Sequence, residues 1–359
     1  MRNLLLGFLS LVVALAVLVV AGELAVRGYL LAQAVLNDHT VLLFAPDEKL
    51  GWRAAPNYRF TGELLDAAGE PYHVRARTDE RGFRAFGDPA VKDRAKLMFI
   101  GDSFTHARHV SDENTYFSVL GEQLSAEVFA LGVGGYGTLQ QYLMLDSYLD
   151  EITPDAVIIQ LCPNDFINNS FQLEFNSARN NNHKRRPYFS NGRISYRLPK
   201  PNPALWHFAN EHSRLLYFLL TRLDRLRPAP QPSSEDYINN RGRSFPAFAQ
   251  AVEVTGLLLA KIRERVPARV PIYAFVTSEA DVFRELAEDN GIRFVPEVPR
   301  ALSRARAQGA VLEAGDGAHW NNAGHRIVAN ALLLPLGAVA PGGVNAAFEA
   351  GTISPAVTP

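Results

Sequence analysis

KLMFIGDSFT, at residues 96–105, is a short apolar run that ends at a glycine and continues into polar residues. Four apolar residues in succession before Gly101 are typical of a strand buried on both faces, and the residues after it indicate a turn and a helix start. Serine is also a common helix cap, so these ten residues fit a capping Ser103 as well as a reactive one. The segment predicts a parallel strand with Ser103 just beyond its carboxyl end.

Similar apolar runs recur toward the C-terminus, separated by segments with helical spacing. The runs predict strands, and the segments between them predict helices. The expected strands are 128–131, 156–161, 271–276 and 292–295, and the expected helices are 116–124, 138–149, 245–266, 280–290, 299–308 and 323–336. Strands and helices that alternate in this way form right-handed crossovers and a parallel sheet covered on both faces. The predicted fold class is therefore α/β.

Composition excludes several classes of protein. The chain has 359 residues, 47% of them hydrophobic, which is enough for one large or two small domains with a buried core. Its formal net charge is −1, so its bulk charge does not favour nucleic acid as a partner. Cys162 is the single cysteine, which rules out an intramolecular disulfide and a cysteine-rich zinc site.

The N-terminal residues indicate where the protein is located in the cell. Arg2 precedes a charge-free, largely apolar run at 4–21, long enough to approach the span of a bilayer core. A cleaved signal peptide and a buried core helix are the alternatives. We favour an uncleaved anchor because the run exceeds the usual signal-peptide core of roughly 7 to 15 residues and the helical pattern continues beyond it. With Arg2 in the cytoplasm, we expect a single-pass protein of the cell membrane whose folded part is exported.

These patterns divide the chain into four parts. Residues 1–30 are expected to be the transmembrane anchor or signal segment, and 31–95 an irregular segment with a small hairpin that leads into the folded domain. The domain is expected at 96–336, with a polar and proline-rich insertion at 166–244 over the sheet edge or the active-site face. Residues 337–359 are expected to be a flexible tail. The basic run at 184–186 is interpreted as a solvated loop.

A second polar constellation lies just before the last expected helix. Asp316 precedes His319 by three residues. A carboxylate at this spacing can bond one ring nitrogen and fix the tautomer in which the other nitrogen accepts a serine proton. The alternative is an ordinary helix start, capped by Asp316 or Asn321, with a partly exposed ring.

Two further residues follow the second and third expected strands, and so reach the same sheet edge as Ser103. Gly135 offers an unobstructed backbone N–H, and Asn164 offers a side-chain amide. Together with the Ser103 N–H they would suit an oxyanion hole, the feature that acyl transfer most needs. A turn-forming glycine and a capping asparagine are the ordinary alternatives.

Together these residues resemble the SGNH/GDSL hydrolase family, whose markers are a serine, a glycine, an asparagine and a histidine in separate blocks. The matching positions, between about 96 and 334, are Ser103 in Gly-Asp-Ser, Gly135 in the glycine loop, Asn164 in the Asn-Asp pair, and Asp316 with His319 in Asp-x-x-His. The resemblance implies a flavodoxin-like three-layer α/β/α sandwich. It also implies a catalytic set of Ser103, Asp316 and His319, an oxyanion hole from Ser103, Gly135 and Asn164, an acyl-enzyme, and no metal or organic cofactor.

The chain departs from the family pattern in two blocks. Ala130 stands where the second block commonly begins with asparagine, and Cys162 where the third commonly has glycine, followed by Pro163. Cys162 is interpreted as a small buried residue, because no base is visibly paired with it. His106 and His109 follow the serine closely and could line the substrate pocket, but we interpret them as exposed helical residues.

The residues therefore predict an exported, membrane-tethered serine esterase that acts on acyl, in particular acetyl, esters of cell-envelope carbohydrate or lipid. An O-acyltransferase that uses the same serine remains an alternative, because water and a sugar hydroxyl would attack the same intermediate. A non-catalytic glycan-binding or assembly protein of the envelope is the third possibility. Retention of the whole predicted site argues against it.

Overall fold

Strand β6 (Lys96–Gly101) lies inside the central sheet of the computed structural model, which describes residues 2–36, 43–226 and 230–339. It pairs in parallel with β7 (Glu127–Gly132) on one side and with β8 (Ala156–Leu161) on the other. Strands β11 (Ile272–Val276) and β12 (Arg293–Phe294) continue the sheet beyond β8, also in parallel. The five parallel strands are ordered second, first, third, fourth and fifth along the chain, as in flavodoxin-like sheets. The predicted α/β class is confirmed.

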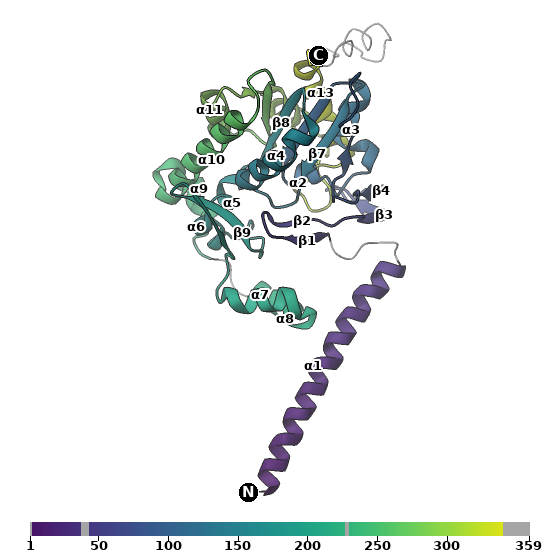
Figure 1. The fold of residues 1–359 in the computed structure, drawn as a ribbon, viewed down its shortest axis with the longest axis vertical. Helices are drawn as coiled ribbons and strands as arrows, with labels where there is room; N and C mark the ends of the chain where they lie inside the picture. Colours follow the sequence, from purple (N-terminus) through teal and green to yellow (C-terminus); the bar gives the residue numbers. More distant parts are fainter. Residues whose placement is uncertain (1, 37–42, 227–229, 340–359) are drawn as a thin grey trace.

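Helices cover both faces of this sheet (Figure 1). One face packs against α4 (Thr138–Ile152), α10 (Pro246–Arg265) and α11 (Asp281–Asp289), and the other against α3 (Tyr116–Gln123), α12 (Glu297–Ala307) and α13 (Asn322–Gly337). The two faces arise because side chains alternate along a strand. In β6, Met98 and Ile100 belong to the first core, whereas Leu97 and Phe99 belong to the second. The sheet is thus the middle layer of a three-layer sandwich.

The segment before β6 is more regular than its composition suggested. It holds two antiparallel hairpins, β1 (Phe44–Asp47) with β2 (Gly51–Ala54) and β3 (Arg59–Leu65) with β4 (Pro71–Arg77). A further strand, β5 (Ala85–Phe86), adds to the central sheet antiparallel to β7. In β3, Phe60, Gly62 and Leu64 are partly shielded and the residues between them are exposed, an alternation that composition does not reveal.

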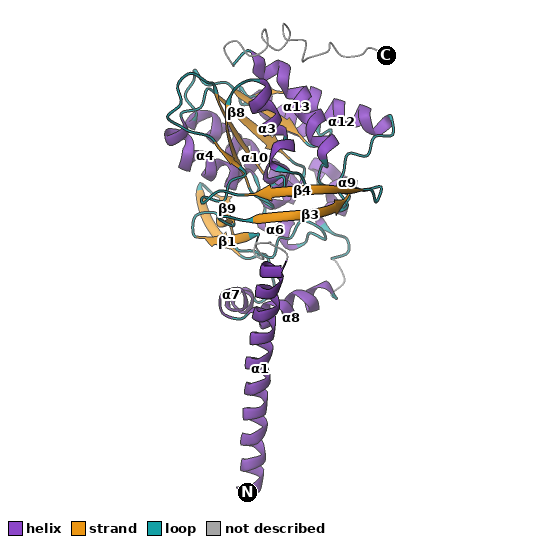
Figure 2. Cartoon of the chain, turned by 90° about the vertical axis from the view of Figure 1, so that its right-hand side faces the viewer, coloured by secondary structure: helices purple, strands orange, loops and turns teal. Residues whose placement is uncertain are grey.

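The region expected as an insertion, 166–244, contains regular structure. Its elements, with the helix that precedes them, are α5 (Asn164–Asn168), α6 (Phe171–Phe175), β9 (Arg186–Ser190), β10 (Arg193–Arg197), α7 (Pro203–His212), α8 (Arg214–Arg225) and α9 (Ser234–Arg241). β9 and β10 form an antiparallel hairpin. Figures 1 and 2 show α7 and α8 set apart from the sandwich, beside the N-terminal helix.

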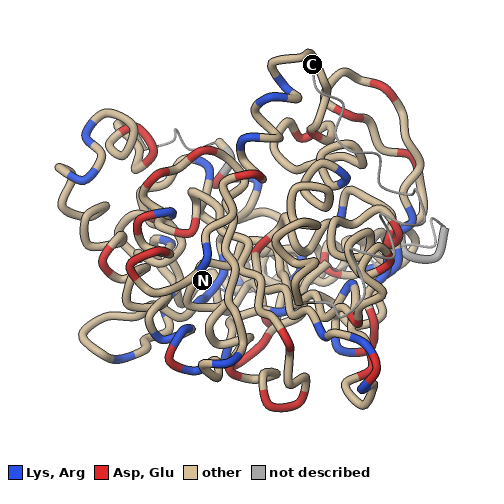
Figure 3. The backbone as a smooth tube through the Cα atoms, turned by 90° about the horizontal axis from the view of Figure 1, so that it is seen from above, with Lys and Arg blue, Asp and Glu red and all other residues tan. Residues whose placement is uncertain are grey.

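Helix α1 (Arg2–Leu36) leads away from the sandwich (Figures 1 and 2). The part of α1 from Arg2 to Ala32 is long and apolar enough to cross a membrane. An 18-residue stretch within it has a mean hydropathy of 3.0, and none of this stretch is buried. At the other end α13 reaches Gly337, and the predicted flexible tail lies, from residue 340 on, outside the described residues. Lys and Arg are interspersed with Asp and Glu along the backbone, in keeping with the near-zero net charge (Figure 3).

Candidate active site

Ser103 is the first residue of α2 (Ser103–His106), the single helical turn that follows β6. The cap of this turn is Asp102, whose side chain accepts a hydrogen bond from the Phe104 N–H at 3.0 Å. The Ser103 hydroxyl is therefore not used for capping. A glycine at 132, at the end of the neighbouring strand, is required because a Cβ there would collide with Thr105 of α2. The tight turn thus places Ser103 at the carboxyl edge of the sheet.

A continuous chain of hydrogen bonds joins Ser103 to His319 and Asp316. The His319 Nε2 lies 2.7 Å from the Ser103 Oγ, and its Nδ1 lies 2.6 Å from the Asp316 Oδ2. The other carboxylate oxygen accepts the backbone N–H groups of Ala318 and His319, both at 3.0 Å. Residues separated by more than two hundred positions in the sequence meet here. The cap of α13 is Asn321, so Asp316 is not needed for that role.

The carboxyl group of Asp316 is held in its ionised form. Partial burial acts to raise its pKa, but the backbone N–H and ring of His319 and the backbone N–H of Ala318 outweigh burial and lower the pKa to about 2. An ionised acceptor favours the His319 tautomer with a proton on Nδ1. In that tautomer the lone pair of Nε2 faces the Ser103 hydroxyl, which is the arrangement of a general base.

A second histidine contacts the same carboxylate. The His109 Nε2 lies 3.3 Å from the Asp316 Oδ2, and its ring stacks on that of His319 with the centroids 4.9 Å apart. The backbone carbonyl of His109 accepts a hydrogen bond from the Tyr72 hydroxyl on β4, at 3.0 Å. The prediction of an exposed helical residue was wrong, because α2 ends at His106 and the chain then runs beneath the β3–β4 hairpin.

His106, His109 and His325 are all buried, and we refer to them together as the buried histidines. Burial lowers their pKa values, to about 3 for His106 and His325 and to about 4 for His109. The nearby arginines and histidines lower them further. His325, predicted to be structural, accepts the Tyr116 N–H at 3.2 Å. All three rings are therefore neutral at pH 7.

His109, Asp316 and His319 place ligand atoms within 4.8 Å of one another, which is the spacing of a metal site. However, both ring nitrogens of His319 already bond within the protein, one to Ser103 and one to Asp316. A metal ion would have to break one of these bonds to gain His319 as a ligand. The hydrogen-bond network accounts for the cluster as it stands.

Gly135 lies three residues beyond β7 and has a φ of +81°, a conformation that favours glycine. A Cβ at this position would lie 2.5 Å from the Asn182 Oδ1, so the insertion packs directly against the glycine loop. The Gly135 carbonyl accepts a hydrogen bond from the Arg186 Nη2 at 2.8 Å. Glycine is therefore required here for both backbone conformation and space.

Asn164 is the first residue of α5, beyond the end of β8. Its Nδ2 donates to the Asn168 Oδ1 at 3.0 Å and lies 3.5 Å from a carboxylate oxygen of Asp102. In the sheet register Ile100 pairs with Ile159, and Gly101 pairs with Gly132. The loops that follow β6, β7 and β8 consequently leave the sheet at the same edge.

The basic run at 184–186 was predicted to be a solvated loop, and the structure corrects this for two of its residues. Arg186 is fully buried and its Nε lies 2.8 Å from the Glu174 Oε2, which also accepts the Tyr188 hydroxyl at 2.9 Å. The Lys184 ammonium lies over the Phe44 ring, 4.6 Å from its centroid. Burial lowers the pKa of Lys184 to about 8. These partners come from α6 and β1, so local sequence carries no signal for them.

Cys162 lies at the departure from the family pattern. Burial raises the pKa of its thiol well above the usual range, with Asp102 and Asp165 acting in the same direction. Its Sγ accepts a hydrogen bond from the Thr277 hydroxyl at 3.4 Å. A thiol kept protonated in this way is a poor nucleophile. The residue as a whole is half-buried rather than buried as predicted.

Comparisons with known proteins identify one family and several similar solved structures. The model of the GDSL-like lipase/acylhydrolase family matches residues 99–327. Similar solved structures include the acetyl xylan esterase AlAXEase, with 15% identity over 67% of this chain and 99% of that chain and a TM-score of 0.36. TesA has 13% identity over 68% and 99%, with a TM-score of 0.38. A catalytic mutant of Axe2, an acetylxylan esterase from Geobacillus stearothermophilus, has 16% identity over 68% and 94%, with a TM-score of 0.37.

At these identities and TM-scores, the likeness to solved structures carries no argument about the substrate. No curated protein matches the chain. The family match is different, because it spans more than half of the chain and includes, in order, every residue that the sequence predicted for the site. The chain therefore belongs to the GDSL-like lipase/acylhydrolase family and is a carboxylic ester hydrolase.

Proposed function

We propose that the protein is a membrane-anchored serine esterase that works through an acyl-enzyme on Ser103. The hydrogen-bonded chain from Asp316 through His319 to Ser103 is the observation that carries this proposal. The Ser103 Oγ attacks the ester carbonyl carbon while the His319 Nε2 takes its proton, and that proton then passes to the departing alcohol. Water then attacks the acyl carbon while the His319 Nε2 takes its proton. That proton passes to the Ser103 Oγ as the acid is released.

The oxyanion formed in this attack would be bound by the N–H groups of Ser103 and Gly135 and by the Asn164 amide. Support comes from their shared sheet edge and from the geometry of Asn164. One amide hydrogen is engaged by Asn168 at 3.0 Å, but the 3.5 Å contact with Asp102 is too long to hold the second one firmly. That hydrogen is available to a developing negative charge.

The substrate class we propose is an acetyl or other short acyl ester of a cell-envelope carbohydrate or lipid. This proposal is supported by contacts between the insertion and the proposed oxyanion hole, because Asn182 packs against Gly135 and Arg186 donates a hydrogen bond to the Gly135 carbonyl. The envelope location rests on α1 as the anchor, with the domain at 96–336 on the exported side because Arg2 precedes the apolar run.

The test uses the full-length chain in detergent micelles with p-nitrophenyl acetate, butyrate and octanoate. We expect Ser103→Ala to lose at least about a thousandfold in kcat, because the nucleophile is gone. Ser195→Ala, an exposed serine on β10, should keep wild-type activity and serves as the matched control. Equal activity of Ser103→Ala and wild type would reject the proposal, and a preference for octanoate would reject the short acyl group.

The covalent step has its own measurement. A fluorophosphonate probe should add to wild type and to Ser195→Ala, but not to Ser103→Ala, when each is read by intact mass. If the probe adds and an oligosaccharide acceptor captures the acyl group faster than water does, the enzyme is an acyltransferase. If the probe fails to add to an active wild-type enzyme, Ser103 does not form an acyl-enzyme.

A further inference from the structure

Helices α7 and α8 (residues 203–226, here the α7–α8 hairpin) expose large apolar side chains. The exposed ones are Leu205, Phe208, Phe218, Leu219, Leu223 and Leu226. Leu219 and Leu223 on α8, and Leu226 directly after its last residue, follow one another at intervals of four and three residues, so they form a single stripe along one face. Leu223 is 58% exposed and Leu226 80% exposed. An apolar stripe of this size on a soluble surface marks an interaction site.

The α7–α8 hairpin is fastened to α1. The Glu23 carboxylate accepts the Ser213 hydroxyl and the backbone N–H groups of Arg214 and Leu215, each at 2.9 Å, so a residue of α1 caps the first turn of α8. Leu215 also packs against Gly22, where an added Cβ would lie 2.9 Å from its Cδ2. These contacts fix α8 at one height along α1.

That height coincides with the end of the apolar run of α1. No charged residue occurs between Arg2 and Glu23, and twenty helical residues rise about 30 Å, which is the thickness of a bilayer's hydrocarbon core. If α1 spans the bilayer, Glu23 lies at its surface, and the start of α8 lies there too. Leu215 belongs to the same stripe as Leu219 and Leu223, so the stripe begins at α1 and continues along that surface.

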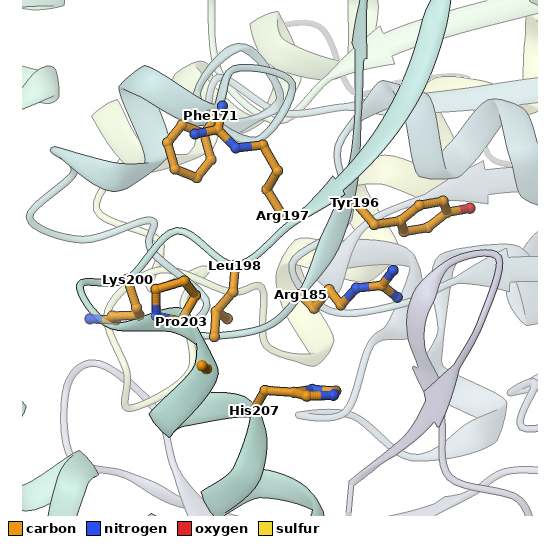
Figure 4. A pocket seen from close by; sticks show the side chains of 9 residues that line it. Phe171, Arg185, Tyr196, Arg197, Leu198, Lys200, Pro203 and His207 are labelled. Carbon is orange, nitrogen blue, oxygen red and sulfur yellow. The ribbon is translucent and has the colours of Figure 1, made fainter.

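Basic side chains lie on the same part of the insertion. A pocket of about 520 Å³ is lined by Arg185, Arg197, Lys200 and His207 together with aromatic and apolar residues, and Figure 4 shows it between β10 and α7. None of its lining residues is a carboxylate. Lys200 is paired with Asp224 of α8, and His207 lies 3.3 Å from the Glu211 carboxylate. The positive charge offered to a lipid surface is therefore that of Arg185 and Arg197, and charge of this sign beside an apolar helix face complements lipid phosphate groups.

We propose that the α7–α8 hairpin is a membrane-docking surface whose apolar stripe enters the lipid leaflet at the level of Glu23, where the apolar run of α1 ends. The occupant is the bilayer itself, and the inference rests on the proposed anchoring by α1. Two attachments, one spanning and one lying on the surface, hold the catalytic domain at a set height and orientation over the membrane.

Nitroxide labels on the full-length chain test this in vesicles of phosphatidylcholine and phosphatidylglycerol. On a Cys162→Ala background, single labels are placed at Leu223→Cys on α8, Val13→Cys on α1 and Leu334→Cys on α13. Leu334 is 76% exposed, and its helix α13 lies at the end of the domain opposite α1 (Figure 1), so it is the matched aqueous control. We expect the labels at 13 and 223 to be relaxed more by oxygen, and the label at 334 more by a water-soluble nickel chelate.

The outcomes are separable. A label at 223 that behaves like the one at 334, while the label at 13 is in lipid, overturns the docking surface and leaves the anchor standing. A label at 13 in water overturns the anchor itself. Spin–spin broadening at 223 that disappears on dilution with unlabelled chain would identify a second copy as the occupant, and would also overturn the proposal. Unchanged hydrolysis of p-nitrophenyl acetate by each labelled chain verifies its fold.

Discussion

Replacing Asp316 by asparagine tests how the candidate site works, because it changes one charge and almost no volume. The Asp316 Oδ1 accepts two backbone N–H groups, so the amide oxygen of an asparagine would stay on that side. Its NH2 group would then face the His319 Nδ1 at the position of a bond that is now 2.6 Å long. Two donors cannot share that bond, so the ring would have to move its proton to Nε2.

The size of the effect follows from this switch of tautomer. With a proton on Nε2, His319 presents a donor to the Ser103 hydroxyl and cannot accept its proton. The same exchange in a serine protease triad lowers kcat by about ten thousandfold, so we expect a loss of roughly 10³ to 10⁴ here, equivalent to about 4 to 5.5 kcal/mol of transition-state stabilisation. KM should change little, because Asp316 lies behind His319 and acts on Ser103 through its ring.

The measurement is kcat and KM for p-nitrophenyl acetate, with the rate of fluorophosphonate addition as a second reading of Ser103 reactivity. Glu313→Gln is the matched control, because it removes one negative charge from the same loop by breaking a surface ion pair with Arg306. It should change kcat by less than about twofold. If Asp316→Asn keeps more than a tenth of the wild-type kcat, the proposed role of this carboxylate is wrong.

Three other changes test the surroundings of the site. Glu174→Gln leaves the Arg186 guanidinium buried without its counterion and should lower the free energy of unfolding by about 3 to 5 kcal/mol in urea titration, whereas Glu285→Gln, in an exposed ion pair, should change it by less than about 1 kcal/mol. Gly135→Ala adds a Cβ against Asn182 at a positive φ and should cost roughly 10² to 10³ in kcat, while Gly192→Ala, also at a positive φ but in open space, should leave kcat unchanged. Lowering the pH from 7 to 5 should destabilise the fold, because the buried histidines protonate near pH 6.5 only after unfolding, so that the unfolded state binds more protons. Each ring should contribute about 2 kcal/mol at pH 5. Burial raises the pKa values of Asp102, Asp165 and Glu174, which act in the opposite direction, so the histidine contribution is measured as the difference between wild type and His325→Asn. An identical pH dependence of the two unfolding free energies would contradict the burial of His325 as a neutral ring.

Local patterns in the sequence were sufficient to predict the sandwich. The alternation of apolar runs with helical spacing reports burial directly, since a strand buried on both faces has to be apolar throughout, as β6 and β8 are. The residues of the candidate site could also be predicted from the sequence, because Ser103, Gly135 and Asn164 each follow a strand and parallel strands end at one edge of the sheet. The three-residue spacing of Asp316 and His319 is a local property of their loop.

The environment of charged and titratable residues was decided only by the tertiary structure. His109 reaches Asp316 because the β3–β4 hairpin covers it, and Arg186 of β9 is buried because Glu174 of another element, α6, supplies a counterion. Similarly, the docking of α8 on α1 depends on Glu23, nearly two hundred residues away. The physical reason is that a charged group is buried only where a partner compensates its desolvation, and such partners come from other elements of the fold. Periodicity specifies which residues form a strand or a helix, but it carries no record of which charges meet when those elements pack.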